Sequence, residues 1–365
     1  MTKPVGIGVV GAGTISDTYL ENLTSFADTD VLAIGDIVPE AAQEKAAKYD
    51  VATAGDVATV LNHPGVEIVV NLTIPAAHAE VASQAIAAGK HVWNEKPLTL
   101  DRVSGRSLLQ DAEAAGLLIG CAPDTFLGPG LQTACRLIEQ GTIGTPLTAL
   151  ALLQLPGPES WHPNPAFLYA AGAGPLFDLG PYYLTAIVQV YGSVSSVAAL
   201  GSKARERRVI GSGPKAGEEF DVMVPSHVSA LVQFESGQSA QAIFSFDSTL
   251  PRTLLEVNGT DATMLLPDPN YFDGDIAVRR RDGENWETVA STTAVSFRGT
   301  GVLDMARAIR EGRPHRAQGK LAYHVLDTMI AIADSVESRA FVEVASSVDK
   351  PPLLPEDWDP LAPTV

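Results

Sequence analysis

The chain has 365 residues, 45% of them hydrophobic, and its 25 Lys and Arg against 43 Asp and Glu give a net charge of −18. This length favours two domains, and this composition is typical of a chain that folds around a core and not of a disordered one. The acidic balance argues against nucleic acid and anionic membranes as partners.

The sequence indicates neither a targeting segment nor a disulfide framework. Two cysteines, Cys121 and Cys135, predict neither a disulfide framework nor a metal site. Neither an apolar signal core at the N-terminus nor a run of about 18 apolar residues is present. We therefore expect a cytoplasmic protein without a metal.

The first predicted element is a buried β-strand over 5–10, which ends in a glycine-rich turn before a helix over 16–26. Such a turn binds a dinucleotide pyrophosphate, because the first N–H groups of the helix are unpaired and its positive end faces the anion. Gly11 permits the tight turn and Gly13 lets the backbone approach the phosphates, whereas Ser16 stands where a third glycine is usual. The residues expected to contact the cofactor here are Gly11, Ala12, Gly13, Thr14 and Ile15.

The next predicted strand, 31–35, ends in Asp36, which follows Gly13 by 23 positions. A carboxylate there accepts hydrogen bonds from the adenosine ribose hydroxyls and repels a 2′-phosphate. The following residues, Ile37 to Pro39, include no Arg or Lys. We therefore predict NAD in preference to NADP, with Asp36 and Ile37 at the adenosine end. The alternative is an Asp that merely ends a strand.

Strands and helices continue to alternate up to about residue 122. Further strands are predicted over 66–72, 91–93 and 117–121, and helices over 40–49, 57–61, 78–88 and 103–115. This alternation predicts a Rossmann-type, doubly wound parallel sheet over 1–122.

After residue 123 the pattern changes to strands, several of them with period-two alternation. They are predicted over 147–155, 194–200, 228–234, 239–246, 253–257 and 263–266, with a hairpin turn at 234–238, and two helices follow over 302–310 and 320–338. This predicts an α+β domain over 123–365, built on a largely antiparallel sheet. We expect a ligand cleft between it and the carboxyl ends of the first domain's strands.

Four segments, in their order and spacing, resemble one family. They are 11–16, 73–78, 89–98, which contains Glu-Lys-Pro, and 172–183, which contains Asp-x-Gly. The chain resembles the glucose–fructose oxidoreductase, inositol dehydrogenase and rhizopine catabolism (Gfo/Idh/MocA) family. The resemblance implies an NAD(P)-dependent oxidoreductase acting on a secondary alcohol of a sugar, a cyclitol or a sugar derivative. It also implies that the second domain forms homodimer or homotetramer contacts.

On the cofactor side, the resemblance implies that Thr73, Pro75 and His78 line the nicotinamide ribose; the alternative for His78 is a helix-start residue facing water. Glu95 and Lys96 belong to the family's signature, in which the Lys contacts both the ribose and the reacting hydroxyl. The proline after Lys96 forces an extended backbone, and partial desolvation in the cleft would lower the pKa of Lys96 and suit it to proton transfer. The alternative is a solvated Lys paired with Glu95.

Asp178 and Tyr182 are the other predicted catalytic residues, together with Lys96. Pro181 suits the first position of a helix over 182–191, which would place Asp178 and Tyr182 at its head, facing the cleft. The family's commonest pattern has His where this chain has Tyr182. A free Tyr titrates near ~10, but a nearby ammonium such as Lys96 favours phenolate. The alternative for Tyr182 is a core aromatic.

Three further residues are candidates for substrate binding. The loop 160–165 contains two prolines, and there His162 can bind a sugar hydroxyl and Trp161 can stack on a sugar face; a plain loop role is the alternative. Asp124 follows the last strand of the first domain and is expected to bind the carboxamide or the substrate.

The residues leave the acid/base open among Tyr182, Lys96 and His162. They also leave two other functions open: a glycoside-cleaving enzyme of the same family, in which the cofactor is reduced and reoxidised in each turnover, and a non-catalytic regulator that senses a dinucleotide. The presence of Lys96 argues against the regulator.

Overall fold

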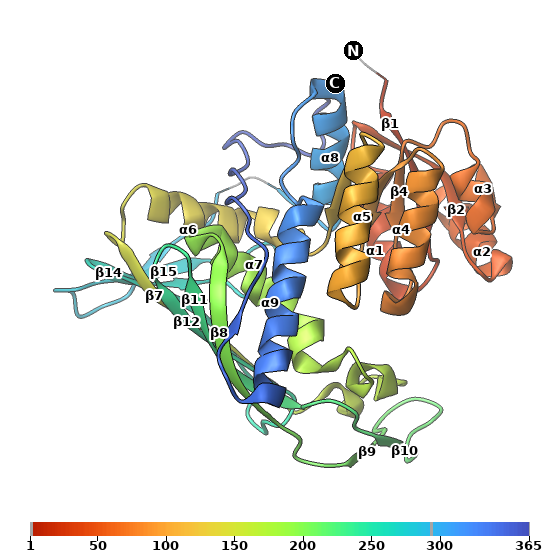
Figure 1. Ribbon diagram of the computed structural model, residues 1–365. Coiled ribbons are helices and arrows are strands. Elements are labelled where there is room, and N and C mark those ends of the chain that lie inside the picture. Colours follow the sequence, from red (N-terminus) through yellow and green to blue (C-terminus); the bar gives the residue numbers. More distant parts are fainter. Residues whose placement is uncertain (1–2, 293–294, 365) are drawn as a thin grey trace. The chain divides into compact units, whose positions relative to one another are not determined.

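The computed structural model describes residues 3–292 and 295–364, and the chain forms two compact units. The first unit comprises 1–129, 293–326 and 351–365, and the second comprises 130–292 and 327–350 (Figure 1). The sequence-based division placed all of 123–365 in the second domain. The structure instead returns two C-terminal stretches to the first unit.

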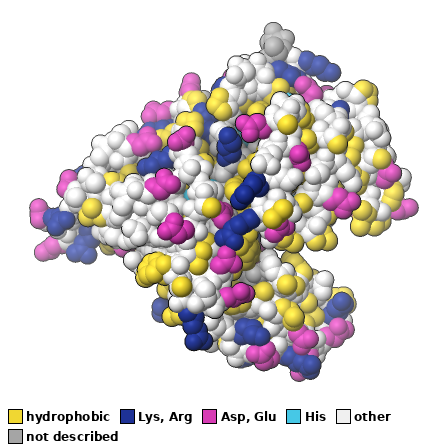
Figure 2. Space-filling view, viewed as in Figure 1, with side chains coloured by type: hydrophobic (Ala, Val, Ile, Leu, Met, Phe, Trp, Pro, Cys, Tyr) yellow, Lys and Arg dark blue, Asp and Glu magenta, His cyan; other side chains and the backbone are white. Residues whose placement is uncertain are grey.

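Charged side chains of both signs are interspersed over the face shown in Figure 2. Cys121 and Cys135 are both free and buried. Among the described residues no helix is both long and apolar enough to cross a membrane.

A six-stranded parallel sheet forms the centre of the first unit, in the order β3-β2-β1-β4-β5-β6. The strands are β1 (Val5–Val10), β2 (Thr29–Gly35), β3 (Thr53–Gly55), β4 (Ile68–Asn71), β5 (His91–Asn94) and β6 (Ile119–Cys121). The helices are α1 (Thr14–Leu23), α2 (Pro39–Tyr49), α3 (Val57–Leu61), α4 (His78–Ala87), α5 (Arg102–Ala114) and α8 (Thr300–Glu311). The predicted Rossmann-type sheet is confirmed, with β3 as a strand that we did not predict.

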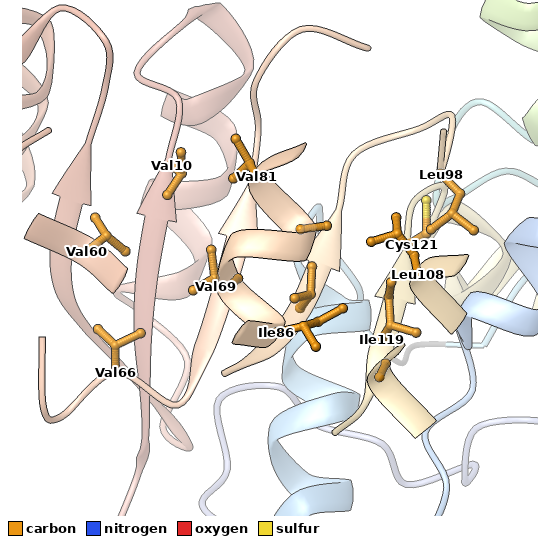
Figure 3. Packing of buried hydrophobic residues seen from close by; sticks show 14 of the residues in the cluster. Val10, Val60, Val66, Val69, Val81, Ile86, Leu98, Leu108, Ile119 and Cys121 are labelled. Carbon is orange, nitrogen blue, oxygen red and sulfur yellow. The ribbon is translucent and has the colours of Figure 1, made fainter. Parts of the chain in front are cut away.

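All six residues of β1 are buried, which explains its β-branched run. Figure 3 shows the apolar cluster on one side of the sheet, where Val10 and Val69 of adjacent strands share a core with Ile86 of α4 and Leu108 of α5. Strand β1 lies between β2 and β4, so the strand order reverses at this point. Ligands bind beside such a reversal, at the carboxyl ends of the strands.

Helix α8 belongs to the first unit, and its expected place in the second domain was wrong. It packs against β6, and a Cβ on Gly301 would lie 2.0 Å from the indole of Trp93. Its side chains Val302, Leu303 and Met305 are fully buried. The pairing joins residues some 200 positions apart in sequence, which local patterns do not encode.

The second unit contains a nine-stranded sheet in the order β16-β15-β14-β13-β7-β12-β11-β8-β17. The strands are β7 (Pro146–Gln154), β8 (Val194–Ser202), β11 (His227–Phe234), β12 (Ser239–Ser245), β13 (Arg252–Gly259), β14 (Ala262–Leu266), β15 (Ile276–Arg280), β16 (Glu287–Val289) and β17 (Val342–Glu343). The β12–β7 pair is parallel and the other pairs are antiparallel, so the sheet is mixed but largely antiparallel, as predicted. The predicted turn after Phe234 joins β11 to β12.

Helices α6 (Pro129–Glu139), α7 (Gly174–Tyr191) and α9 (Gly319–Ser338) complete the fold. Helix α7 packs on β7, β11 and β12. It begins at Gly174, eight residues before the expected start, with Pro175 in its first turn and Pro181 inside it. Pro181 was therefore wrongly interpreted as the helix start, because Pro175 already provides the preset φ of a first turn.

Candidate functional site

The turn between β1 and α1 has the geometry of an anion site. Gly11 has φ +104°, and a Cβ there would lie 2.7 Å from the carbonyl of Leu72, so only glycine fits without strain. A Cβ on Gly13 would meet no described atom within 4 Å. Gly13 is the N-cap of α1, and Gly13 to Ile15 are exposed. The first N–H groups of a helix have no partner within the helix, and at such an exposed turn they fit a pyrophosphate.

Ser16 replaces the third glycine without opening the turn. Its side chain is fully buried, and its Oγ donates to the carbonyl oxygen of Gly13 over 2.7 Å. The serine therefore fixes the first turn of α1 from the inside.

Asp36 lies directly after β2, beside the glycine turn. Its Oδ2 accepts the N–H of Ala12 at 2.7 Å and its Oδ1 accepts the N–H of Val38 at 2.9 Å. Each carboxylate oxygen can accept a second donor, which fits the two ribose hydroxyls of an adenosine. Ile37 is 89% exposed and offers apolar surface at the same edge.

His78 occupies neither of its two expected environments. Its ring is 1% exposed, with Nδ1 2.7 Å from the carbonyl oxygen of Pro97 and Nε2 3.0 Å from that of Thr73. A ring enclosed in this way neither lines a ribose nor faces water, so both expectations were wrong. His78 instead links the turn after β4, which carries Thr73 and Pro75, to the turn after β5.

Two buried asparagines complete this link, and the sequence analysis missed them. Asn71 Nδ2 donates to the carbonyl of His78 (3.1 Å) and to Oδ1 of Asn94 (2.9 Å), while Asn94 Nδ2 donates to the carbonyl of Leu98 (3.1 Å). Thr73 Oγ1 donates to Asn71 Oδ1 over 2.6 Å. Each asparagine ends an apolar strand, and a polar residue in that position is a signal that could have identified them.

Glu95 and Lys96 follow β5 at the same edge of the sheet. Glu95 Oε1 accepts from the phenol of Tyr19 (2.8 Å), which in turn accepts from the indole N–H of Trp93 (3.2 Å). Burial raises the pKa of Tyr19, so its phenol remains a donor. Glu95 Oε2 accepts the backbone N–H of Lys96 (2.9 Å), and the Lys96 side chain is half-buried.

Asp124 is not a substrate-binding residue, in contrast to the prediction. It is 0% exposed, and its carboxylate accepts the N–H groups of Gly299 (2.8 Å) and Gly301 (3.2 Å) and pairs with Arg298. It therefore caps the N-terminus of α8. Burial raises the pKa of Asp124, although Arg298 and the two backbone donors oppose this shift.

Asp178 and Tyr182 lie four residues apart within α7, so they share one face of that helix. Asp178 is half-buried and Tyr182 is buried. The predicted alternative of a packing residue applies more clearly to Tyr183, which is 0% exposed and donates to Asp268 (3.3 Å).

Trp161 and His162 lie on an exposed loop of the second unit, as expected. Trp161 is 67% exposed, and its ring centroid lies 5.5 Å from that of His162. Nδ1 of His162 accepts the N–H of Asn164 (3.0 Å), so a neutral ring carries its proton on Nε2 and can donate it to a substrate oxygen. Across the described ranges, no cluster of three or more His, Cys, Asp or Glu could hold a metal ion.

Comparisons with known proteins agree with this arrangement. Residues 5–122 match the family model described as "Oxidoreductase family, NAD-binding Rossmann fold", and residues 131–265 match the "GFO/IDH/MocA C-terminal domain". The chain is 27% identical to trans-1,2-dihydrobenzene-1,2-diol dehydrogenase of Sus scrofa over 83% of this chain and 87% of that protein.

Two further matches follow the same pattern. The chain is 33% identical to inositol 2-dehydrogenase/D-chiro-inositol 3-dehydrogenase of Lactiplantibacillus plantarum, over 39% of this chain and 41% of that protein. An NAD binding oxidoreductase from Klebsiella pneumoniae has the same fold, with a TM-score of 0.83 and 23% identity over 94% of this chain and all of that one. With both domain models matched in order along the sequence, the chain belongs to the Gfo/Idh/MocA family of oxidoreductases.

Proposed function

We propose that this protein oxidises a secondary alcohol of a cyclic sugar, a cyclitol or a sugar derivative with NAD+, and catalyses the reverse reduction. One observation carries the proposal. In their order across the sheet, strands β2, β1, β4 and β5 are followed by Asp36, the open glycine turn, Thr73 and Lys96, respectively. This edge offers a ribose acceptor, an anion site and an ammonium group, in the order in which a dinucleotide needs them.

The preference for NAD+ over NADP+ rests on Asp36. Both of its oxygens already accept backbone donors, so the carboxylate is fixed in place, where it would repel a 2′-phosphate. We expect Asp36→Ser to reduce kcat/KM for NAD+ and to raise it for NADP+, changing their ratio by about 100-fold. An unchanged ratio in steady-state assays would contradict the assignment.

The substrate class is supported by the relatives and by the second unit. The two relatives above are named for a dihydrobenzenediol and for inositols, which are ring compounds with secondary hydroxyls. The exposed ring of Trp161 fits a sugar or cyclitol face, and Nε2 of His162 fits a hydroxyl.

For the chemistry, we assign Tyr182 to accept the hydroxyl proton and Lys96 to stabilise the developing alkoxide, with Asp178 binding a neighbouring hydroxyl. NAD+, when bound, supplies the hydride acceptor. In the reverse direction Tyr182 returns the proton to the substrate oxygen. Asp178 and Tyr182 act from one helix face, so a vicinal diol can contact both side chains.

We further propose that the protein forms homo-oligomers through the large sheet. Leu200 on β8, Leu231 on β11 and Phe341 beside β17 are each more than half exposed. These side chains line one largely apolar surface hollow together with Ala198 and Ile243, of a kind that monomers seldom leave in water.

The test of function is an assay of NADH formation with NAD+ and with NADP+, over a panel of aldoses, inositols, anhydrosugars and glycosides. Accumulation of NADH with a cyclic polyol is the expected result. Glycoside cleavage without NADH accumulation would favour the glycoside-cleaving alternative. Tight NAD+ binding with no turnover on any substrate would favour a regulator.

A further inference from the structure

The loop after β7 carries three aromatic rings, two of them exposed. Trp161 and Phe167 are each more than half exposed, and His162 lies between them, with ring centroids 5.5 Å and 5.4 Å away at steep angles. Exposed aromatic rings bind the apolar faces of ring compounds. To keep these rings in a fixed arrangement, the loop has to be held by contacts with other parts of the chain.

A separate hairpin lies against this loop. Strands β9 (Arg207–Val209) and β10 (Glu219–Asp221) form a two-stranded sheet of their own, which is marginal without other contacts. Next to β9, Gly211 N–H donates to the carbonyl of Glu159 (2.8 Å); next to β10, Met223 N–H donates to that of Tyr169 (2.8 Å). The hairpin therefore holds the loop near both of its ends.

Arg208 is the side chain of the hairpin that contacts the loop. It is buried, and its guanidinium donates to the carboxylates of Glu159 and Asp247 and to the carbonyl of Phe246 (3.2 Å). It also lies over the ring of Tyr169, 4.9 Å from the centroid. A planar guanidinium suits this site, because one fork reaches two carboxylates while its face stacks on an aromatic ring.

Other residues of the loop pack closely around Arg208. The second oxygen of Glu159 accepts from the phenol of Tyr169, whose pKa is raised by burial and by that hydrogen bond, so the phenol remains a donor. Gly157 has φ +103°, and a Cβ there would lie 2.7 Å from Nη1 of Arg208 and 2.8 Å from the phenol oxygen of Tyr169. The side chains of Arg208 and Tyr169 therefore leave no space for a methyl group at Gly157, where the loop begins.

We infer that Arg208 is a positioning residue for substrate recognition: through Glu159 and Tyr169 it holds the loop that carries Trp161, His162 and Phe167 in a preformed state. The inference rests on the proposed function for its substrate, a cyclic polyol. A preformed loop binds more tightly than a mobile one, because its ordering entropy is lost on folding and not on binding. Arg208 therefore affects KM for the polyol more than kcat.

The positioning role is tested first without cofactor or substrate. Hydrogen–deuterium exchange is compared between Arg208→Lys and Arg207→Lys, since Arg207 is the neighbour whose guanidinium pairs with Glu219 and Asp221 at the surface. In Arg208→Lys we expect peptides within 157–169 to exchange about tenfold faster, and in Arg207→Lys we expect no change. Unchanged exchange in Arg208→Lys, or faster exchange throughout the second unit, would overturn the inference.

The second test is kinetic. With a cyclic polyol, Arg208→Lys should raise KM about tenfold, leave kcat within about threefold, and leave KM for NAD+ unchanged. Tyr169→Phe, which keeps the ring and both carboxylates, should raise KM by a smaller factor.

In a Trp161→Ala background the same Arg208→Lys change should raise KM by less than about twofold, because the two residues act through one loop. Independent, multiplying effects would refute the inference. Absence of NADH formation by the unmodified enzyme would contradict the proposed function instead, and the exchange experiment would still decide the role of Arg208.

Discussion

The two units hold their functional groups in different ways. In the first unit, the candidate groups follow parallel strands and are fixed by backbone amides and by uncharged side chains, such as Asn71 and Asn94. In the second, they lie on one helix and one loop, and the loop is fixed by a buried arginine between two carboxylates. The first arrangement follows from the sheet itself, whereas the second depends on individual side chains. We therefore expect the cofactor-binding groups to tolerate fewer changes in the backbone. We expect the substrate-binding groups to be altered more easily by single side-chain substitutions.

Removing one reacting group from each unit should have the greatest effect on turnover. We expect Lys96→Gln and Tyr182→Phe each to lower kcat by about 100-fold or more, since each removes a proton-transfer or charge-stabilising group. Isothermal titration should show nearly unchanged NAD+ binding in Tyr182→Phe. The matched control is Tyr183→Phe, which removes the hydroxyl of the neighbouring buried tyrosine and should keep most of the turnover. Near-normal turnover in Tyr182→Phe, with loss of turnover in His162→Ala, would transfer the acid/base role to His162.

Acid should affect the first unit through His315. Burial lowers the pKa of His315 from 6.5 to about 4, so the unfolded chain takes up a proton that the folded unit excludes. The stability linked to His315 is thus complete above pH 6.5 and is lost as the pH falls toward 4. This amounts to about 2 kcal/mol at pH 5 and about 3 kcal/mol at pH 4.

This loss of unfolding free energy is measured by urea unfolding at pH 7 and pH 5, with the exchange-resistant amides of each unit as the signal. His315→Gln should remove that part of the pH dependence. If its pH dependence equals that of the unmodified protein, His315 is not the group responsible.

Two glycines of one turn separate binding from folding within the first unit. Gly13→Ala places a methyl group in open space, so the melting temperature should be unchanged while the Kd for NAD+ rises about tenfold. Gly11→Ala should weaken binding and also lower the melting temperature, because φ is +104° there and the new Cβ meets the carbonyl of Leu72. Equal melting temperatures for both variants would show that the turn relaxes.

The smallest expected effect on turnover comes from the large sheet of the second unit. Leu231→Lys places a charge in its exposed apolar surface and should lower the molar mass in sedimentation equilibrium, with kcat changed by about twofold or less. The neighbouring Gln233→Lys, also exposed on β11, is the control and should keep the native mass. An unchanged mass for Leu231→Lys would place the oligomer contact elsewhere.

Sequence patterns predicted the parallel sheet well, because its signals are local. The apolar run of β1, the glycine turn and Asp36 lie within 32 residues, and each of them predicts its local structure by itself. Asp124 and His78 were misplaced for the opposite reason. The backbone donors that surround Asp124 come from residues 299 and 301, and the carbonyls around His78 depend on how two turns meet.

In the second unit, short polar strands such as β9 and β10 gave no periodic signal. These strands are stabilised by contacts that Arg208 of β9 makes with a loop some 50 residues earlier in the sequence. Pro181 was informative about helix geometry but ambiguous about position, since a helix can carry a proline in its interior when packing supports it.

The contact between α8 and the sheet also has a consequence for biosynthesis. When residues 1–129 have left the ribosome, the indole of Trp93 still lacks the helix that seats Gly301 against it, because that helix is translated some 170 residues later. During this interval we expect the nascent chain to expose an apolar flank of the kind that promotes aggregation. A gene fragment that stops at the apparent end of the Rossmann sheet should accordingly yield an aggregation-prone product.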